Sequence, residues 1–449
     1  MVPGNLLLWL TALIVVPAAT VMGTASAGSF MAAAAVAVLV IAALVDAALS
    51  HDKLGRIAAV YPPVVHGTKG RAVDLECKFM GFAGPMRVGL QLPDSLHCQD
   101  PVLKVGPPGT AAKWSLLPLK RGRHVFTAFH VETRSQFGFF LVRRSVPAQI
   151  ELRIYPNLHR ERRGLAAVFL NRGGPGIHAR AQVGKGREFD HLRDYVSGDD
   201  YGDIHWKTTA RRGLPVMKTF QVERTREVYA IIDHSRLSAR SLKMPVGGAL
   251  SEHATGGEYQ VTTQIERSIE SALVLALAAE RQHDRFGMVT FAEHVTGCVR
   301  SSSGHAHYVT CRNALFTLEP HLVSPSFDEL FIFLRRTLTR RSLLVILTDL
   351  SDPLQAESFA AGVRLISRHH LVLVSMIRPE SAHPLFARVD VTSVDDVYRD
   401  LAGHFLWHDL QEVGSVLAQQ AVHFTLPDCA DLTVDVVSQY MNIRRRQLL

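Results

Sequence analysis

The chain opens with two long apolar stretches separated by a short neutral segment. Residues 6–22 carry no charge, and residues 30–49 are interrupted only by Asp46. Each stretch is close to the roughly 20 residues that a helix needs to cross the core of a bilayer. The residues between them, 23–29, are small and neutral. The pattern therefore predicts a two-helix membrane hairpin over residues 1–55.

The flanking charges predict an orientation for this hairpin. Lys53 and Arg56 follow the second stretch, whereas the segment between the stretches is uncharged. The positive-inside rule then places the N-terminus and residues 51–449 in the cytoplasm, with two spans in the cell (inner) membrane. A cleaved signal peptide is the alternative, because Ala25-Ser26-Ala27 resembles a cleavage site. The absence of Lys and Arg before Leu6 favours the hairpin.

Residues 56–155 show the two-residue period of β-strands. Val73, Leu75, Cys77 and Phe79 alternate with charged residues, so that one face of this segment is apolar. Pro and Gly separate the runs that follow, and short strands at this spacing favour a small antiparallel β-sandwich. The further strands are expected at residues 86–92, 114–119, 124–131, 137–142 and 149–155.

The pattern changes again after a Gly- and Arg-rich segment at residues 156–185. From residue 227 to residue 449, continuous apolar runs alternate with amphipathic stretches of helical period. Such an alternation is typical of an α/β fold with a doubly wound parallel sheet, whose ligands bind at the carboxyl ends of the strands. Strands are expected at 228–233, 286–291, 342–348, 371–377 and 422–426, and helices at 264–282, 307–316, 327–339, 354–369, 410–420 and up to about 445.

Composition adds two constraints. The five cysteines are odd in number and widely spaced, which suits reduced thiols in the cytosol better than a disulfide framework. The formal net charge is +8. A basic cytoplasmic domain beside an anionic leaflet explains this charge, and because no basic patch with interleaved aromatic residues is present, no nucleic-acid partner is predicted.

Recognised catalytic motifs are missing from the sequence. It contains no G-x-S-x-G, no H-E-x-x-H and no P-loop. Gly184-x-Gly186 lacks the third glycine of a dinucleotide site, and His305-x-His307 has no partner cluster for a metal. The sequence therefore predicts a protein that is not an enzyme and takes no small-molecule substrate.

Charge is segregated within residues 186–223, which we call the charged box. Residues 187–203 hold six acids and two arginines, whereas residues 204–226 hold six bases and one acid. Three interpretations stay open: the halves fold on each other as a structural clasp, they dock a partner of complementary charge, or the acidic half is the site of an enzyme such as a hydrolase.

The charged box resembles the domain-of-unknown-function family 58. Members share G-x-E-F-x-x-L-R-x-Y-x-x-G-D, then I-x-W-x-x-(S/T)-A-R, then a Leu and a late Glu. The segments 119–122 and 136–138 resemble the sandwich of the same family. The matching residues of the box are Gly186, Glu188, Phe189, Leu192, Arg193, Tyr195, Gly198, Asp199, Ile204, Trp206, Thr209, Ala210, Arg211, Leu214 and Glu223.

The resemblance implies both a fold and partners. Downstream of the box, family members resemble von Willebrand factor A domains, which implies a doubly wound parallel sheet of that type over residues 227–449. The family commonly accompanies MoxR-type AAA ATPases and membrane proteins of the same operon. It therefore implies a membrane-anchored cytoplasmic scaffold or adaptor, which works with a MoxR-type ATPase in the assembly or maturation of envelope proteins.

A domain of this type binds Mg²⁺ through Asp-x-Ser-x-Ser after its first strand, a Thr from a second loop and an Asp from a third. Asp233 and Ser235 match the first two positions, but Leu237 replaces the second serine. Asp349 matches the third-loop Asp, whereas no motif fixes the Thr among Thr310 and residues 301–303. These oxygen ligands suit Mg²⁺.

Two readings of this degenerate site stay open. In the first, Asp233, Ser235 and Asp349 hold Mg²⁺ and the protein is a metal-dependent binding module without an ATPase. In the second, backbone amides at the start of the following helix cap Asp233, and no metal binds. Both readings place Asp233 and Asp349 together at one edge of the sheet.

Overall fold

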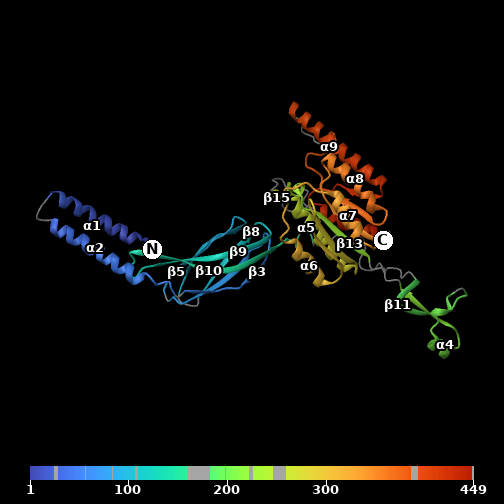
Figure 1. Cartoon of the computed structure of the whole chain (residues 1–449), viewed down its shortest axis with the longest axis horizontal. Coiled ribbons are helices and arrows are strands. Elements are labelled where there is room, and N and C mark those ends of the chain that lie inside the picture. The colour runs from blue at the N-terminus through green and yellow to red at the C-terminus, as the bar shows by residue number, and fades with distance from the viewer. Residues whose placement is uncertain are drawn as a thin grey trace. The chain divides into compact units, whose positions relative to one another are not determined.

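The computed structural model of the chain forms two compact units, Met1–Asn157 and Leu158–Leu449, each of which is described separately (Figure 1). The structure describes residues 1–24, 29–55, 57–82, 84–106, 110–159, 161, 183–197, 199–221, 226–245, 259–385 and 393–446.

The first unit begins with two apolar helices that lie side by side, α1 (Asn5–Thr24) and α2 (Ser29–Ser50) (Figure 1). Within the described part of the chain, Phe30–Ser50 is the one helix long and apolar enough to cross a membrane. Asn5–Thr20 is a shorter apolar helix. Most of the side chains of both helices are exposed in the chain itself, as expected for surfaces that contact lipid.

Asp46, the single charge of α2, ties this helix to the sandwich. Its carboxylate is fully buried and accepts hydrogen bonds from Ser135 Oγ at 2.5 Å, Phe137 N at 2.9 Å and Phe139 N at 3.2 Å. These donors lie in one loop, and Gly138 gives the loop a turn with φ +82°. The interruption of the apolar stretch is therefore a satisfied anchor and not an unpaired charge.

The N-terminus reaches the same loop. Strand β1 (Val2–Pro3) pairs with β10 (Phe140–Tyr155), and Gly4 N donates to Phe139 O at 2.7 Å. The start of α1 and the end of α2 are consequently held at one hairpin of the sandwich. Because both ends are pinned there, the two helices run in opposite directions.

Two sheets form the sandwich. One has the order β1-β10-β9-β5-β7, with β3 (Val64–Thr68) added to β10, and the other has the order β2-β4-β8-β6. In β4 the predicted alternation is confirmed, since Leu75, Cys77 and Phe79 are buried. The remaining strands are β2 (Ala58–Val60), β4 (Val73–Met80), β5 (Met86–Leu90), β6 (Leu96–Cys98), β7 (Val102–Val105), β8 (Ala111–Pro118) and β9 (Gly122–Arg134).

The structure corrects two expectations for this region. The strands predicted at residues 137–142 and 149–155 are one long strand, β10, whose register shifts between Pro147 and Ile150. Exposed residues 143–145 interrupt the apolar pattern of this strand without ending it. The sandwich is also not purely antiparallel, because β3 pairs with β10 in parallel.

An aromatic cluster fills the sandwich core. Trp114 and Phe129 are fully buried and stack with ring centroids 5.9 Å apart, while Phe79 meets Phe129 edge-on at 5.3 Å. Such offset and edge-to-face pairs are favoured over face-to-face contact because of the ring quadrupoles. The core of this unit therefore lies between the two sheets.

The second unit is built on a six-stranded sheet with the order β17-β16-β13-β18-β19-β20. Its strands are β13 (Glu227–Asp233), β16 (Arg285–Phe291), β17 (Val295–Ser302), β18 (Ser342–Leu347), β19 (Leu371–Ser375) and β20 (Val422–Thr425). Five strands are parallel, and β17, which the pattern did not predict, is an antiparallel edge strand. The alternation in β17 is only partly apolar because one face of an edge strand stays exposed.

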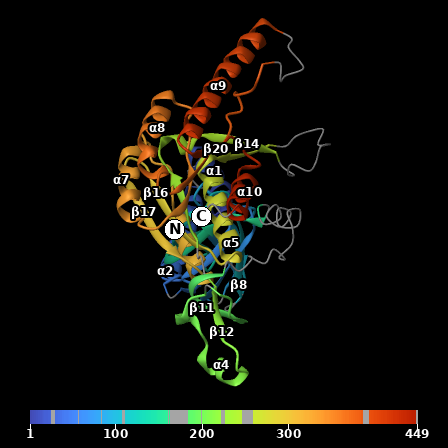
Figure 2. The same cartoon turned by 90° about the vertical axis from the view of Figure 1, so that its right-hand side faces the viewer.

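Helices cover both faces of this sheet. On one face, Val228, Ala230 and Ile232 of β13 pack with α5 (Gln264–Arg281), α6 (His305–Leu315) and α10 (Leu432–Arg445). On the other, Tyr229 and Ile231 pack with α7 (Phe327–Thr337), α8 (Pro353–Ser367) and α9 (Val394–Gln419). Figure 2 shows α7 and α8 on one side of the sheet and α5 and α10 on the other. The central strand is therefore buried on both faces.

Two further elements differ from the expectation. The helix predicted at residues 410–420 is α9, which begins at Val394, where Ser393 and Asp396 form a capping box. Between the strand expected at 228–233 and the helix expected at 264–282, where no strand was expected, lie the antiparallel strands β14 (Ser241–Pro245) and β15 (Tyr259–Thr263).

We predict that Asp46→Ala destabilises the sandwich by about 3 kcal/mol, because it leaves buried N–H donors of the 135–139 loop without an acceptor. Asp46→Asn keeps one carbonyl oxygen as an acceptor, so it should lower the stability of the sandwich less than Asp46→Ala does. The measurement is thermal or urea unfolding of the full chain in detergent, followed by tryptophan fluorescence with Trp9, Trp206 and Trp407 replaced by Phe so that Trp114 reports. Equal stability of Asp46→Ala and the unchanged chain would contradict the anchor.

Candidate functional site at the carboxyl end of the central sheet

The two predicted aspartates meet where the central strands end. Asp233 is the last residue of β13, and Asp349 lies two residues beyond the end of β18. The strands are paired in parallel with Ile232 opposite Leu347, so their carboxyl ends share one edge. Both aspartates are 2% exposed. The sequence correctly predicted this juxtaposition.

Protein donors satisfy both oxygens of Asp233. Ser235 N donates to Oδ1 at 2.8 Å, and Thr348 Oγ1 donates to Oδ2 at 2.6 Å. Burial raises the pKa of Asp233 above its ordinary value, and the nearby negative charge of Asp349 acts in the same direction. The hydrogen bond from Thr348 opposes this rise without reversing it.

A cationic side chain accompanies Asp349. Arg240 Nη1 lies 3.4 Å from Asp349 Oδ2, and Ser351 N donates to Oδ1 at 2.9 Å. The Arg240 side chain is 36% exposed, whereas the Asp349 side chain is 3% exposed. The guanidinium of Arg240 therefore supplies positive charge beside the two carboxylates.

The two serines of the loop after β13, Ser235 and Ser238, make different contacts. The Ser235 hydroxyl is fully buried and makes no hydrogen bond of good geometry among the described residues, although it lies close enough to Asp233 to help lower its pKa. Ser238 Oγ donates to Ser235 O at 2.7 Å and so does not turn toward Asp233. Leu237 stands where the metal pattern has its second serine.

This donor set does not fit a resident Mg²⁺ as it stands. Mg²⁺ requires near-octahedral oxygen ligands and usually keeps several waters. Here Asp233 is occupied by protein donors, Asp349 is paired with Arg240, and an alkyl side chain replaces one ligand. Among the described residues, no group of three or more His, Cys, Asp or Glu side chains is arranged to hold a metal ion. Mg²⁺ binding stays a prediction.

The hydroxyl groups considered as metal ligands from the second loop do not lie beside Asp233. Phe286 pairs with Ser302, whereas Asp233 pairs with Phe291, so residues 301–303 lie at the opposite end of the sheet. Thr310 Oγ1 donates to Ala306 O within its own helix. The hydroxyl that does reach Asp233 belongs to Thr348, which directly precedes Asp349.

Sequence reasoning missed both Thr348 and Arg240. Thr348 could have been found from the sequence, because parallel pairing of the first and third expected apolar strands, 228–233 and 342–348, puts the residue before Asp349 opposite Asp233. The sequence holds no comparable signal for Arg240, because its contact with Asp349 depends on the path of the loop from β13 to β14.

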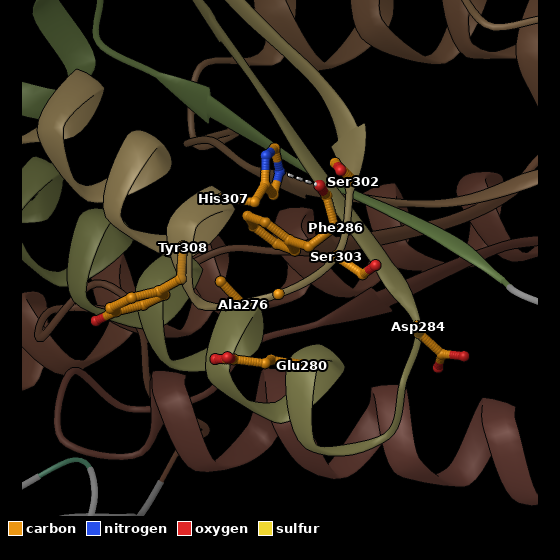
Figure 3. A pocket seen from close by; sticks show the side chains of 9 residues that line it. Ala276, Glu280, Asp284, Phe286, Ser302, Ser303, His307 and Tyr308 are labelled. Atoms are coloured by element: carbon orange, nitrogen blue, oxygen red, sulfur yellow. Dashed lines mark hydrogen bonds between the residues drawn. The ribbon is translucent and has the colours of Figure 1, made fainter.

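A small pocket lies at the far end of the sheet, beside α5 and α6. Its volume is about 10 Å³, enough for roughly one water molecule. Figure 3 shows His307 directed at Phe286, whose carbonyl oxygen lies 2.7 Å from His307 Nε2. His305 is largely exposed and lies 4.0 Å from Glu280. The His305-x-His307 pair therefore makes separate contacts and no joint site.

The charged box folds as a β-hairpin with a short helix. Strands β11 (Val183–Asp194) and β12 (Val216–Gln221) are antiparallel, and between them lie η1 (Tyr201–Asp203) and α4 (Trp206–Arg212). Gly186, Glu188 and Phe189 lie in β11. Gly198 and Glu223 lie outside the described residues.

Hydrogen bonds and a ring contact hold the turn of the box. Arg193 Nη2 donates to Asp199 Oδ1 at 2.6 Å, and Val196 N donates to Oδ2 at 2.9 Å. These bonds lower the pKa of Asp199, the one from Arg193 most. Tyr195 stacks on Tyr201 with ring centroids 6.0 Å apart, and Ile204 is buried against Met217. Arg193 and Asp199 both belong to the acidic half, so this ion pair does not join the two halves as a clasp would.

One surface of the box is both apolar and basic. Trp206 is 68% exposed and Leu214 is 66% exposed. Lys207, Ala210 and Arg211 on α4 are exposed as well. His205 caps this helix by accepting from Thr208 N, and Gly213 ends it in the left-handed conformation. The exposed side chains therefore stand on a locally ordered turn, which we call the α4 surface.

Comparison with known proteins identifies the central part of the chain. Residues 191–395 match the family described as "Protein of unknown function DUF58". This match confirms the family predicted from the charged box. No curated protein sequence matches the chain.

Several solved structures are similar at low identity. An aerotolerance-related membrane protein from Bacteroides fragilis is 13% identical, covering 48% of this chain and 98% of its own, with a TM-score of 0.28. The conserved hypothetical protein BatB from Bacteroides thetaiotaomicron is 12% identical over 49% and 99%, with a TM-score of 0.30. The VWA domain of SpRpn10 is 8% identical over 48% and 95%, with a TM-score of 0.27.

We predict that Asp233→Asn changes how stability depends on pH. A raised pKa means that the folded chain holds the proton more tightly than the unfolded chain. The stability from this carboxyl is complete below its ordinary pKa of 3.8 and is lost as the pH rises through the raised value. An uncharged amide avoids this loss, so the variant should gain stability relative to the unchanged chain as the pH is raised from 4 to 8.

Urea unfolding across this pH range measures the difference. The matched control is Asp94→Asn, which makes the same change at an exposed loop position. A stability difference for Asp233→Asn that stays constant with pH would show that Asp233 carries no such penalty.

Proposed function

We propose that this chain, a DUF58 family member through residues 191–395, is a membrane-anchored cytoplasmic scaffold or adaptor that docks a protein partner. Its partner would be a MoxR-type AAA ATPase, together with membrane proteins of the same operon, in the assembly or maturation of envelope proteins. The proposal includes no enzymatic activity, no nucleic-acid partner and no small-molecule substrate.

The N-terminal helices support the membrane anchor. Phe30–Ser50 is long and apolar enough to cross a bilayer, and a shorter apolar helix lies beside it. The hairpin that binds Asp46 and Gly4 holds both outer ends of the helix pair. Two spans with both ends in the cytoplasm satisfy this constraint and agree with Lys53 after the second helix.

The α4 surface is the observation that carries the docking proposal. Trp and Arg are the residues most enriched among those that dominate the energy of protein interfaces. Trp206 is exposed on a basic helix turn whose conformation is fixed by caps at both ends. A preorganised turn loses little conformational entropy on binding, so such a surface suits a partner with an acidic, apolar groove.

A metal-dependent binding module without an ATPase is the second candidate. The buried Ser235 hydroxyl beside two aspartates favours it, because this oxygen lacks a hydrogen bond of good geometry. A bound Mg²⁺ would need Arg240 to leave Asp349. Calorimetric titration of the chain with Mg²⁺, with Asp233→Ala as the control, separates this candidate from the first.

A hydrolase that uses the acidic half of the box is a third candidate from another class. A general acid at neutral pH needs a raised pKa. The pKa of Asp199 is instead lowered by Arg193. The contacts of the acidic half therefore favour a structural role for Asp199.

We predict that Trp206→Ala and Arg211→Ala each weaken capture of the MoxR-type ATPase by on the order of tenfold or more, because each removes a side chain of the class that dominates interface energies. The measurement is a pull-down of the ATPase with the full chain in detergent. Leu322→Ala is the matched control, since Leu322 is an equally prominent apolar side chain, 85% exposed, outside the box. Unchanged capture by both α4 variants would rule out docking through this surface.

A further inference from the structure

We propose that one face of the β-sandwich binds the phosphate headgroups of anionic phospholipids. This face is the outer surface of the β10-β9-β5-β7 sheet near the 135–139 loop that binds Asp46, and we call it the basic face. Its cationic side chains are Arg134, Arg143, Arg87 and Lys104. The inference rests on the membrane anchoring proposed above.

Strand register gathers these cations in neighbouring rows. Arg143 of β10 lies opposite Glu132 of β9, which lies opposite Arg87 of β5, which lies opposite Lys104 of β7. Arg134 belongs to the next row toward the β9–β10 hairpin. Residues opposite one another in a sheet point to the same face. Four cations and one carboxylate therefore share a surface.

The carboxylate leaves most of the positive charge available. Glu132 Oε2 accepts from Arg143 Nε at 2.7 Å, and Glu132 Oε1 lies 3.7 Å from Arg87 Nη1. Glu132 is 19% exposed, whereas both arginine side chains are more than half exposed. Each guanidinium has five N–H donors in a fork that matches phosphate. The ion pairs orient the arginines, and their remaining donors face solvent.

A groove beside the arginines gives a headgroup room. The following row consists of Ser145, His130, Gly89 and Val102. A groove of about 590 Å³ is lined by residues of this row and by Arg87 and Arg143. Ser145 and His130 add polar groups to its wall.

The position of the face matches the depth of lipid headgroups. The 135–139 loop binds Asp46, one turn before α2 ends at Ser50. Arg143 is three residues beyond Phe140, or about 10 Å along the strand, and Asp46 lies four residues, or about 6 Å, before the end of α2. For a strand that continues the line of α2, Arg143 therefore lies about 4 Å beyond Ser50. The headgroup layer extends roughly 5–8 Å beyond the hydrocarbon core. Phe137 at the loop tip is 55% exposed and suits the membrane interface, where aromatic rings are enriched.

The same sheet carries a chemically similar cluster farther from the helices. Arg123 and Arg153 flank Glu151 at 3.2 Å and 2.7 Å, much as Arg87 and Arg143 flank Glu132. Arg153 lies ten residues farther along β10 than Arg143. Because this distal cluster lies beyond the reach of headgroups, it serves as a matched control for charge and geometry.

The test is lipid retention by the full chain, measured by native mass spectrometry in detergent with added phosphatidylglycerol or phosphatidylcholine. We expect retention of phosphatidylglycerol in preference to phosphatidylcholine. Arg87→Gln with Arg143→Gln should weaken that retention by on the order of tenfold or more. Arg123→Gln with Arg153→Gln should leave it unchanged. Lys104→Gln, an exposed single change, should weaken it about fivefold and covers the case in which the double variant fails to fold.

Four outcomes overturn the inference. The first three are equal retention of both lipids, an equal loss in the proximal and distal double variants, and unchanged retention by the Lys104→Gln variant. The fourth is displacement of the lipid by millimolar inorganic phosphate, because the site would then take a soluble anion. Flotation with phosphatidylcholine liposomes tests the anchor separately. A chain that floats without lipid preference refutes only the basic face, whereas a chain that does not float refutes the membrane anchor itself.

Discussion

The carboxylate of Asp46 joins the apolar helices to the folded body of the first unit. In an apolar helix an ionised side chain is costly unless it is paired or fully hydrogen-bonded. Here a single loop supplies two backbone amides and a hydroxyl. The same loop receives Gly4 N and adjoins β1, so the N-terminus is fixed as well. The direction of both helices, and the depth of the basic face, follow from this one junction.

The second unit resolves a different electrostatic conflict. Parallel strands bring Asp233 and Asp349 to one edge of the sheet, where two buried carboxylates repel. The chain compensates with Thr348, backbone amides and Arg240. An arginine on this edge neutralises part of the negative charge, which distinguishes the arrangement from an open metal site. The α4 surface of the charged box is separate from this edge in sequence and rests on its own caps and ion pair.

Periodicity predicted the parallel strands of the second unit's central sheet and the helices that cover them. Continuous apolar runs such as β13 and β18 are buried on both faces, and the alternation in β4 separates its buried and exposed residues. The edge strand β17 escaped prediction because its exposed face weakens the apolar pattern. The early turns of α9 escaped prediction as well, and their apolar residues, such as Val394, Val397 and Tyr398, are exposed. The position of Asp349 followed from strand order, but Arg240 did not, because long-range contacts of loop side chains leave no periodic signal.

The orientation of the chain is the central claim, since both the docking surface and the basic face depend on it. The most direct measurement is a topology assay in living cells, with fluorescent-protein and phosphatase reporters fused after Leu449 or inserted at residues 25–28. The account predicts fluorescence after Leu449 and phosphatase activity between the helices. Phosphatase activity after Leu449 would place the folded units outside the cytoplasm and contradict the account.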